Sequence, residues 1–542
     1  MLSLEKIDRF KNKACLSKKF PLIITLKRIF SHQKWYKSTE NTEKVRRTSR
    51  MDEQLTREYF TDFAKNDEEL YVGEVDNAAA AGWAERNIPL FSCSRKELER
   101  IYYYRWWTFR KHLFSTPEGK LISEFLPKVP WAGKYNTINC ALGFHLREAR
   151  WLRNERDTTE NYLRFWLEGS GDVQSYSCWI AQTVLDVCNV LGNETLPGKL
   201  LQPLTEFYEQ REKTHLHGCG LFWSDDDRDA MEFSISGKGL RPTLNSYMYA
   251  NARAIAAIAW KDGQEELAQK YDEKVVRLRE RILRYLWDPK DQFFKVIPLN
   301  SVRDELRFHS FEDVPEERNA IEEIGLIPWQ FHLPDEAYAS AFERLKDEKC
   351  FKAPYGPTTA DQSHPRFMYP VDHECLWNGP VWPFATSQTL LAAANLLQDG
   401  KANGHFSREN YLELLETYAR SHRRETKEGR VIPWIDEDQD PYTGEWISRK
   451  ILEEAGWPEN IGGYERGKDY NHSEFCDLII TGYCGVVPLE NGRVKIKPLC
   501  GENDWFRLEK LPLRGKLLTV QYDGDGTHFG KAGLIVEADG VE

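Results

Sequence analysis

The sequence predicts a mainly α-helical fold, an (α/α)6 toroid of six helical hairpins, followed by a small C-terminal β-strand appendage. Between residues 95 and 485, apolar residues recur at three- and four-residue steps in about a dozen segments. After Pro488 the apolar residues alternate instead with a period of two. The 542 residues are enough for one large helical ring and an appendage. We therefore expect successive helices to pair as hairpins and close into a ring.

One helix is marked by an unbroken apolar stripe over 265–287, formed by Leu267, Tyr271, Val275, Leu278, Ile282 and Tyr285. Similar but shorter stripes predict further helices at 95–115, 138–154, 157–169, 176–193, 199–213, 243–261, 334–347, 380–398, 408–423, 447–455 and 473–485. Long loops at 288–332, 349–379 and 425–472 separate some of them. Ordered loops of this length usually carry function.

Period-two alternation marks the C-terminal part of the chain. It is seen at Val494 and Ile496, and again around Val520 and Val536, with turn residues such as Asn491-Gly492 between the runs. We expect a helical catalytic domain over 51–490 and a β-strand appendage over 491–542.

Residues 1–50 differ from the rest of the chain in charge. They hold 14 Lys and Arg against 4 Asp and Glu, whereas the whole chain has a net charge of -11. The short apolar piece from Phe20 to Leu26 is less than a secretory signal needs. We expect this segment to be a basic, disordered extension.

Composition excludes several classes of partner. A net charge of -11 disfavours nucleic acids and anionic membranes, and no apolar run approaches the ~20 residues of a membrane span.

The 11 cysteines are scattered, without CxxC pairs or zinc-type Cys/His spacing, which predicts a reducing, cytoplasmic location and no metal centre. The oligomeric state is not predicted. Aromatic residues make up 13% of the chain, and such rings fill cores or stack on sugars.

Two acidic stretches lie in loops among aromatic residues. The first runs from Trp223 to Glu232 and contains Asp225, Asp226, Asp227 and Asp229. The second runs from Trp434 to Trp446 and contains Glu437. Each is also explained by solvated surface turns. Glycosidic bond cleavage requires two carboxyl groups, one protonated and one ionised, and each stretch supplies candidates for one of them.

Six motifs in order give the chain a family resemblance from about residue 80 to about 490. The sequence resembles the family 63 glycoside hydrolases and their mannosylglycerate-hydrolase-like relatives, which are six-hairpin (α/α)6 glycosidases. The motifs are Trp131–Cys140 with Arg150-Trp151, Arg228-Asp229, Tyr355–Thr359, Trp377–Trp382, Glu437–Gly444 and Asn471–Gly482.

The resemblance implies an aspartate as the acid and a glutamate as the base. The acid maps onto Asp229, and the base maps onto Glu437, four residues before Pro441. Because three aspartates follow Ser224 where the family has glycine, Asp226 and Asp227 are alternatives for the acid. If the mechanism were not inverting, Glu232 would be the next carboxyl group to consider.

The predicted function is that of an inverting exo-α-glycosidase acting on an α-glucoside, an α-mannoside or a related oligosaccharide. The expected substrate-binding residues are Arg228, Trp223, Trp377, Asn378, Trp382, Tyr442 and His472. No organic cofactor is needed, although a structural calcium ion at Asp225–Asp227 fits the pattern. The alternatives are a non-catalytic carbohydrate-binding toroid and a phosphorylase or lyase on the same fold.

Overall fold

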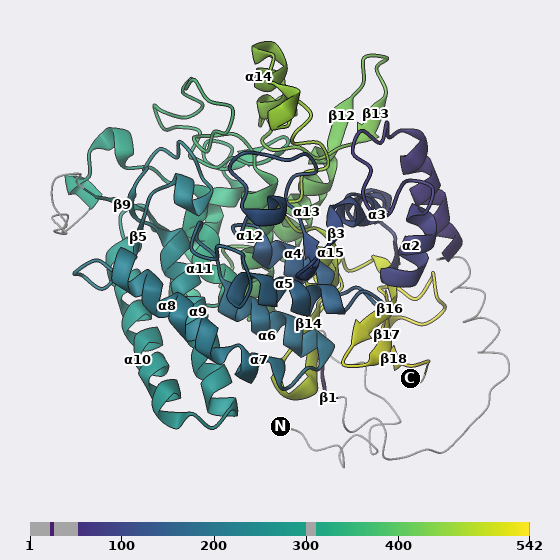
Figure 1. Ribbon diagram of the computed structural model, residues 1–542, viewed down its shortest axis with the longest axis horizontal. Coiled ribbons are helices and arrows are strands. Elements are labelled where there is room, and N and C mark those ends of the chain that lie inside the picture. Colours follow the sequence, from purple (N-terminus) through teal and green to yellow (C-terminus); the bar gives the residue numbers. More distant parts are fainter. Residues whose placement is uncertain (1–21, 26–52, 300–310, 541–542) are drawn as a thin grey trace.

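The computed structural model describes residues 22–25, 53–299 and 311–540, and it confirms a mainly helical chain (Figure 1). The predicted helix at 334–347 is a 3-10 helix, η10 (Glu336–Lys346). The α-helices are α2 (Ala80–Asn87), α3 (Lys96–Phe109), α4 (Leu142–Ala149), α5 (Asp157–Leu167), α6 (Ile180–Leu191), α7 (Leu196–Lys199), α8 (Leu201–His215), α9 (Pro242–Lys261), α10 (Glu265–Arg281), α11 (Ile327–Gln330), α12 (Pro383–Gln398), α13 (Arg408–Ser421), α14 (Ile447–Ala455) and α15 (Cys476–Leu478).

Six of these helices contact one another in a closed circuit. α4 packs on α6, α6 on α9, and α9 on α11. α11 then packs on α12, α12 contacts α15, and α15 returns to α4. Other helices pack on members of this circuit: α5 on α4, α10 on α9, and α13 on α12.

Burial separates the helices of the circuit from those around it. In α9 and α12 almost every side chain is buried, as expected for helices with neighbours on all sides. In α10, by contrast, only Ala268, Tyr271 and Leu278 are buried. The apolar stripe predicted from the sequence is therefore the face that α10 turns toward α9.

The C-terminal strands form a sheet that also includes a strand from the helical part of the chain. The order is β18-β17-β16-β2, with β2 (Leu90–Cys93) paired antiparallel to β16 (Trp505–Leu513). β17 (Lys516–Asp523) and β18 (Gly533–Ala538) match the predicted alternating segments. Phe91 lies opposite Leu508, and both side chains are buried. The strands after residue 490 thus pair with a strand of the helical part of the chain. This pairing was not part of the expected appendage.

A second, three-stranded sheet has the order β1-β15-β14. β14 (Val486–Pro488) and β15 (Arg493–Ile496) follow the last helical segment, and β1 (Leu22–Thr25) pairs with β15. β1 falls inside the segment expected to be a disordered extension over 1–50, and its three β-branched residues, Ile23, Ile24 and Thr25, suit an edge strand. The rest of that segment lies outside the described residues. Among the described residues, no helix has the length and apolar character needed to cross a membrane.

Candidate active site

Three loops meet beside the start of α12. The backbone N–H of Trp377 donates to the carbonyl of Glu232 at 3.0 Å. Val381 and Gln439 exchange two backbone hydrogen bonds of 2.9 Å each. The Trp377–Trp382 turn therefore joins the two acidic stretches that the sequence singled out.

Glu437 is buried in an ion pair with Arg466. Arg466 Nε donates to Glu437 Oε1 at 2.8 Å, and Nη2 donates to Oε2 at 3.0 Å. Arg466 Nη1 also donates to Glu374 at 2.9 Å. The guanidinium lies over the rings of Trp131 and Trp457, at 4.9 and 5.5 Å. This bidentate contact fixes the Glu437 carboxylate and supplies its counter-charge.

Gly467 allows the segment with Arg466 to approach Glu437 closely. A Cβ at this position would overlap Asp436 Oδ1 and lie 3.3 Å from Glu437 Cγ. A larger residue would therefore push the Arg466 segment away from the acidic stretch.

The other acids of the second stretch have structural partners. Asp436 accepts a hydrogen bond from Trp434 Nε1 at 3.2 Å and lies 3.6 Å from Arg449. Asp438 accepts from the backbone N–H of Ser448 at 2.9 Å at the start of α14, and Asp440 accepts from two backbone N–H groups of the following turn. Glu437 is the member of this stretch that pairs with Arg466.

Among the carboxyl groups of the first acidic stretch, Glu232 has the environment best suited to a proton donor. Burial raises the pKa of Glu232 to about 7, and the charges of Asp227 and Glu437 add to the rise. The Cys375 thiol donates to Glu232 Oε2 at 3.1 Å, and this hydrogen bond opposes the rise in the pKa. Near neutral pH, this carboxyl group is therefore partly protonated and electrostatically coupled to Glu437.

Asp229 has a different environment. Its Oδ2 accepts from Arg241 Nε at 2.6 Å, its Oδ1 accepts from Ser177 Oγ at 2.6 Å, and the Asp229 and Arg241 side chains are both 0% exposed. Burial raises the pKa of Asp229, and the Arg241 charge opposes that rise. Both carboxylate oxygens are thus occupied by protein groups at the start of α9.

The three aspartates that precede Asp229 have separate partners. Asp225 pairs with Lys238 at 3.1 Å, Asp226 accepts from Ser234 at 3.2 Å, and Asp227 lies 3.7 Å from Arg228. In the part of the chain that the structure describes, they do not form a group that could hold a metal ion. The expected calcium site gains no support from this geometry.

Two of the aromatic residues expected to bind substrate lie together. The rings of Trp377 and Trp382 are stacked at 4.7 Å, and both are buried. The Trp382 ring also contacts the ring of His472 edge-on at 6.3 Å. Asn378, in the same turn, is buried and donates to the carbonyl of Tyr369 at 2.9 Å, so it holds the turn.

Three other expected contacts lie elsewhere. Tyr442 is 51% exposed and donates to Gln362, because the Asp440 turn carries its side chain to the surface. The Trp223 ring packs against His215 and under Lys238, and the Arg228 side chain is 52% exposed above Tyr176. The geometry therefore places none of these three beside the Trp377–Trp382 stack.

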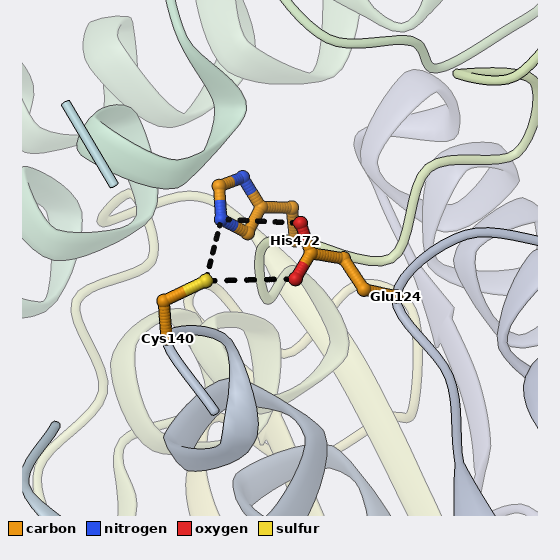
Figure 2. Close-up of side chains that lie close together, drawn as sticks. All are labelled: Glu124, Cys140 and His472. Atoms are coloured by element: carbon orange, nitrogen blue, oxygen red, sulfur yellow. Dashed lines mark hydrogen bonds and ion pairs between the residues drawn. The ribbon is translucent and has the colours of Figure 1, made fainter. Parts of the chain in front are cut away.

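A buried cluster that the sequence did not reveal surrounds His472 (Figure 2). Glu124 accepts from Tyr470 at 2.9 Å, and the Cys140 thiol lies 3.5 Å from both Glu124 and His472. Burial raises the pKa of Glu124 to about 8, and the charges of Glu437 and Glu232 raise it further. These charge effects link the cluster to both carboxyl groups described above.

Comparison with known proteins identifies the family of this chain. Residues 134–473 match the family described as mannosylglycerate hydrolase MGH1-like glycoside hydrolase domain, which is more than half of the chain. The chain belongs to this family. The matched region of this glycoside hydrolase domain contains Glu232, Trp377, Glu437 and Arg466 but begins after Glu124.

Solved structures similar to this glycoside hydrolase extend the comparison. A structure titled "Sialidase" is 34% identical with a TM-score of 0.80, and the match covers 90% of this chain but only 43% of that one. The GH63 mannosylglycerate hydrolase from Thermus thermophilus in complex with glucose is 13% identical, with a TM-score of 0.46, over 70% of this chain and 98% of that one. The α-L-rhamnosidase from Aspergillus terreus is 12% identical, with a TM-score of 0.44, over 84% and 50%.

Sequence reasoning missed several residues of the site. Arg466 and Cys375 stand in long loops, and no spacing connects them to the carboxyl groups that they contact. Glu124 is a single acid in a loop 348 positions before His472. The only signal was the length of the loops 349–379 and 425–472, which predicted function without naming residues.

We expect Asp229→Asn to destabilise the protein, because it leaves Arg241 charged, buried and without its carboxylate. The loss of stability should be about 3–5 kcal/mol, measured by urea unfolding. Asp226→Asn is the matched control, since its carboxylate contacts only a serine hydroxyl, and it should change stability little. An Asp229→Asn protein with unchanged stability and no activity would instead support Asp229 as the acid.

Proposed function

We propose that this glycoside hydrolase is an inverting exo-α-glycosidase that acts on an α-glucoside, an α-mannoside or a related oligosaccharide. One observation carries the proposal: two electrostatically coupled carboxyl groups have opposite environments beside a tryptophan stack. Glu437 pairs with an arginine, and Glu232 is partly protonated near neutral pH. Pairs of carboxyl groups with such separated environments divide the acid and base roles between them.

In this proposal Glu437 activates the attacking water. The two hydrogen bonds from Arg466 orient the carboxylate, so that its remaining lone pairs are available to a water molecule. Removal of a proton from that water makes it nucleophilic at the anomeric carbon as the glycosidic bond breaks.

The proposed proton donor is Glu232 rather than Asp229. A donor must release its proton to the leaving oxygen and take another from solvent. Asp229 is fully buried, and both of its oxygens accept hydrogen bonds from protein groups. Glu232 has one described hydrogen-bond partner, the Cys375 thiol, and a pKa of about 7. Asp229 then acts as a structural anchor for the acidic loop at the start of α9.

We also propose that the closed circuit of six helices is the inner layer of an (α/α)6 toroid. Its support is the unbroken series of contacts from α4 through α6, α9, α11, α12 and α15 back to α4. The helices α5, α10 and α13, each packed on a different inner helix, supply part of the outer layer.

A neutral sugar fits this site better than a sialic acid. A sialoside carries a carboxylate, which needs an available cation, and Arg466 already pairs with Glu437 and Glu374. The structure titled "Sialidase" is covered over only 43% of its length. Its title therefore supports a glycosidase domain here, without transferring its substrate.

Glu232→Gln and Glu437→Gln should each lower kcat/KM on an aryl α-glycoside by about 10²–10⁴-fold, because each removes one proton-transfer group. Glu232→Gln should melt at nearly the wild-type temperature, whereas Glu437→Gln should be less stable because the buried Arg466 keeps only Glu374 as a carboxylate partner. Asp227→Asn is the control, because its side chain is half-exposed beside the same loop, and it should retain activity. With a dinitrophenyl leaving group, which needs little protonation, Glu232→Gln should recover much more activity than Glu437→Gln. Sugar binding without any turnover in the wild type would favour the non-catalytic toroid.

Activity should fall as the pH rises through about 7, because the acid must be protonated and burial sets the Glu232 pKa near that value. Replacing Cys375 with Ala removes a hydrogen bond that favours ionised Glu232. The pH at which activity falls should therefore be higher in this variant. Cys178→Ala, which removes a buried thiol that lies 3.9 Å from the carbonyl of Val173, should leave this pH unchanged. A pH profile of kcat/KM for the three proteins tests this assignment.

The first product from an α-glycoside should be the β-anomer, because a water molecule activated by Glu437 displaces the leaving group directly. Proton NMR of the anomeric signals in the first minutes distinguishes this result from retention. Early appearance of the α-anomer would require a covalent intermediate and rule out the proposed roles. A dependence of turnover on phosphate, or an unsaturated product that absorbs in the ultraviolet, would point to the phosphorylase or lyase alternatives.

A further inference from the structure

We propose that Glu124, Cys140 and His472 form a binding site for a divalent cation of the zinc class. Their carboxylate, thiol and imidazole groups face one another, as Figure 2 shows, and all three side chains are buried. They are the one group of three potential metal ligands among the described residues whose ligand atoms all lie within 4.8 Å of one another. The site goes beyond the proposed hydrolysis, which uses two other carboxyl groups.

The distances inside the cluster suit coordination of a single ion. Cys140 Sγ lies 3.5 Å from Glu124 Oε2 and 3.5 Å from His472 Nε2, and His472 Nε2 lies 3.6 Å from Glu124 Oε1. The last distance is too long for a hydrogen bond between nitrogen and oxygen. A point equidistant from three atoms at such separations lies about 2.0–2.1 Å from each, close to the zinc bond lengths of about 2.0–2.3 Å.

The donor set selects the class of ion. Thiolate and imidazole ligands favour zinc and cobalt over calcium and magnesium, which prefer oxygen ligands. The Tyr470 hydroxyl donates to Glu124 at 2.9 Å and fixes the carboxylate, as outer groups do in metal sites. His472 Nδ1 has no hydrogen-bond partner among the described residues, whereas Nε2 faces Cys140 and Glu124. Nε2 is therefore the nitrogen that would bind the ion.

The segments that supply the ligands come from distant parts of the sequence. Glu124 follows β4 (Gly119–Ile122), Cys140 lies just before α4, and His472 lies just before α15. Because α4 and α15 are in contact, the two helix starts bring Cys140 and His472 together. The usual short ligand spacings of zinc sites are therefore not needed here.

An ion at this site would act on the reaction as an inhibitor, a consequence that rests on the proposed function. The charges of Glu124 and Glu232 influence each other. A divalent cation bound at Glu124 favours the ionised form of Glu232, which then lacks the proton that the acid must donate. Hydrolysis should therefore decrease as zinc is added.

The test uses full-length protein treated with a chelator and then titrated with Co²⁺, whose bond to a thiolate produces a near-ultraviolet charge-transfer band. Wild type should bind one Co²⁺ with this band, and Zn²⁺ should displace it. Cys140→Ser should lose the band and bind cobalt about tenfold more weakly or worse. Cys178→Ser is the matched control, and Cys375→Ser tests the other thiol beside a carboxyl group. Both variants should bind cobalt with the same band and affinity as the wild type. Unfolding curves verify that each variant is folded.

The proposal is overturned if the wild-type protein shows no band at one equivalent, or if folded Cys140→Ser retains it. Loss of the band in Cys375→Ser alone would place the ion at Glu232 instead and also overturn it. The binding measurement needs no sugar, so it is independent of the proposed function. Zinc binding at Cys140 without effect on hydrolysis would remove only the inhibitory consequence.

Discussion

The buried ion pair between Glu437 and Arg466 is the interaction on which the rest of the site depends. A buried carboxylate without a partner costs several kcal/mol, so Glu437 needs this arginine to remain in place. Arg466 reaches it only because Gly467 allows close approach. Glu374 uses a second nitrogen of the same guanidinium, which joins the loop before α12 to the same centre. One cation therefore holds together segments of two long loops.

This pairing also makes the contrast with Glu232 possible. Glu437 faces a guanidinium, whereas Glu232 faces a neutral thiol that is a weak hydrogen-bond donor. The negative charge of Glu437 raises the pKa of Glu232, so the base helps to keep the acid protonated. A site of this kind needs one arginine and not two: a second cation at Glu232 would lower its pKa and remove the proton. At Asp229, a few residues away, the charge of Arg241 opposes the rise in pKa that burial causes.

The helices were predictable from the sequence because their periodicity is local. The positions of α3, α9, α12 and α13 follow from apolar spacing, and Pro242 and Pro383 stand at the first helical residue, where proline is tolerated. The pairing of β2 with β16 was not predictable, since the two strands are more than 400 residues apart. Non-local pairing leaves no trace in a single sequence.

The loops of the candidate site could be predicted from the sequence, but the contacts of each carboxyl group could not. The sequence identified both acidic stretches and the Trp377–Trp382 turn, which do meet. It could not show that Asp229 faces Arg241 whereas Glu232, three residues later, faces a thiol. That difference depends on a 3-10 turn over Asp227–Asp229 followed by a left-handed residue, Ala230. The exposed position of Tyr442, in the second stretch, was likewise not predictable, because a local turn directs the side chain outward.

Several residues around the site share one position in the fold, because they lie just before helices of the circuit. Cys140 precedes α4, Ser177 precedes α6, Arg241 precedes α9, and Trp382 precedes α12. Hydrogen bonds, ring contacts and charge effects connect these helix starts, which places them at one end of the circuit. The amino ends of helices carry partial positive charge, worth about 0.3–1 kcal/mol each for a nearby carboxylate. The charges of Glu124, Glu232 and Glu437 influence one another near these helix starts. The circuit therefore brings together three carboxyl groups from distant parts of the sequence, while the Asp229–Arg241 pair holds the adjoining acidic loop at the start of α9.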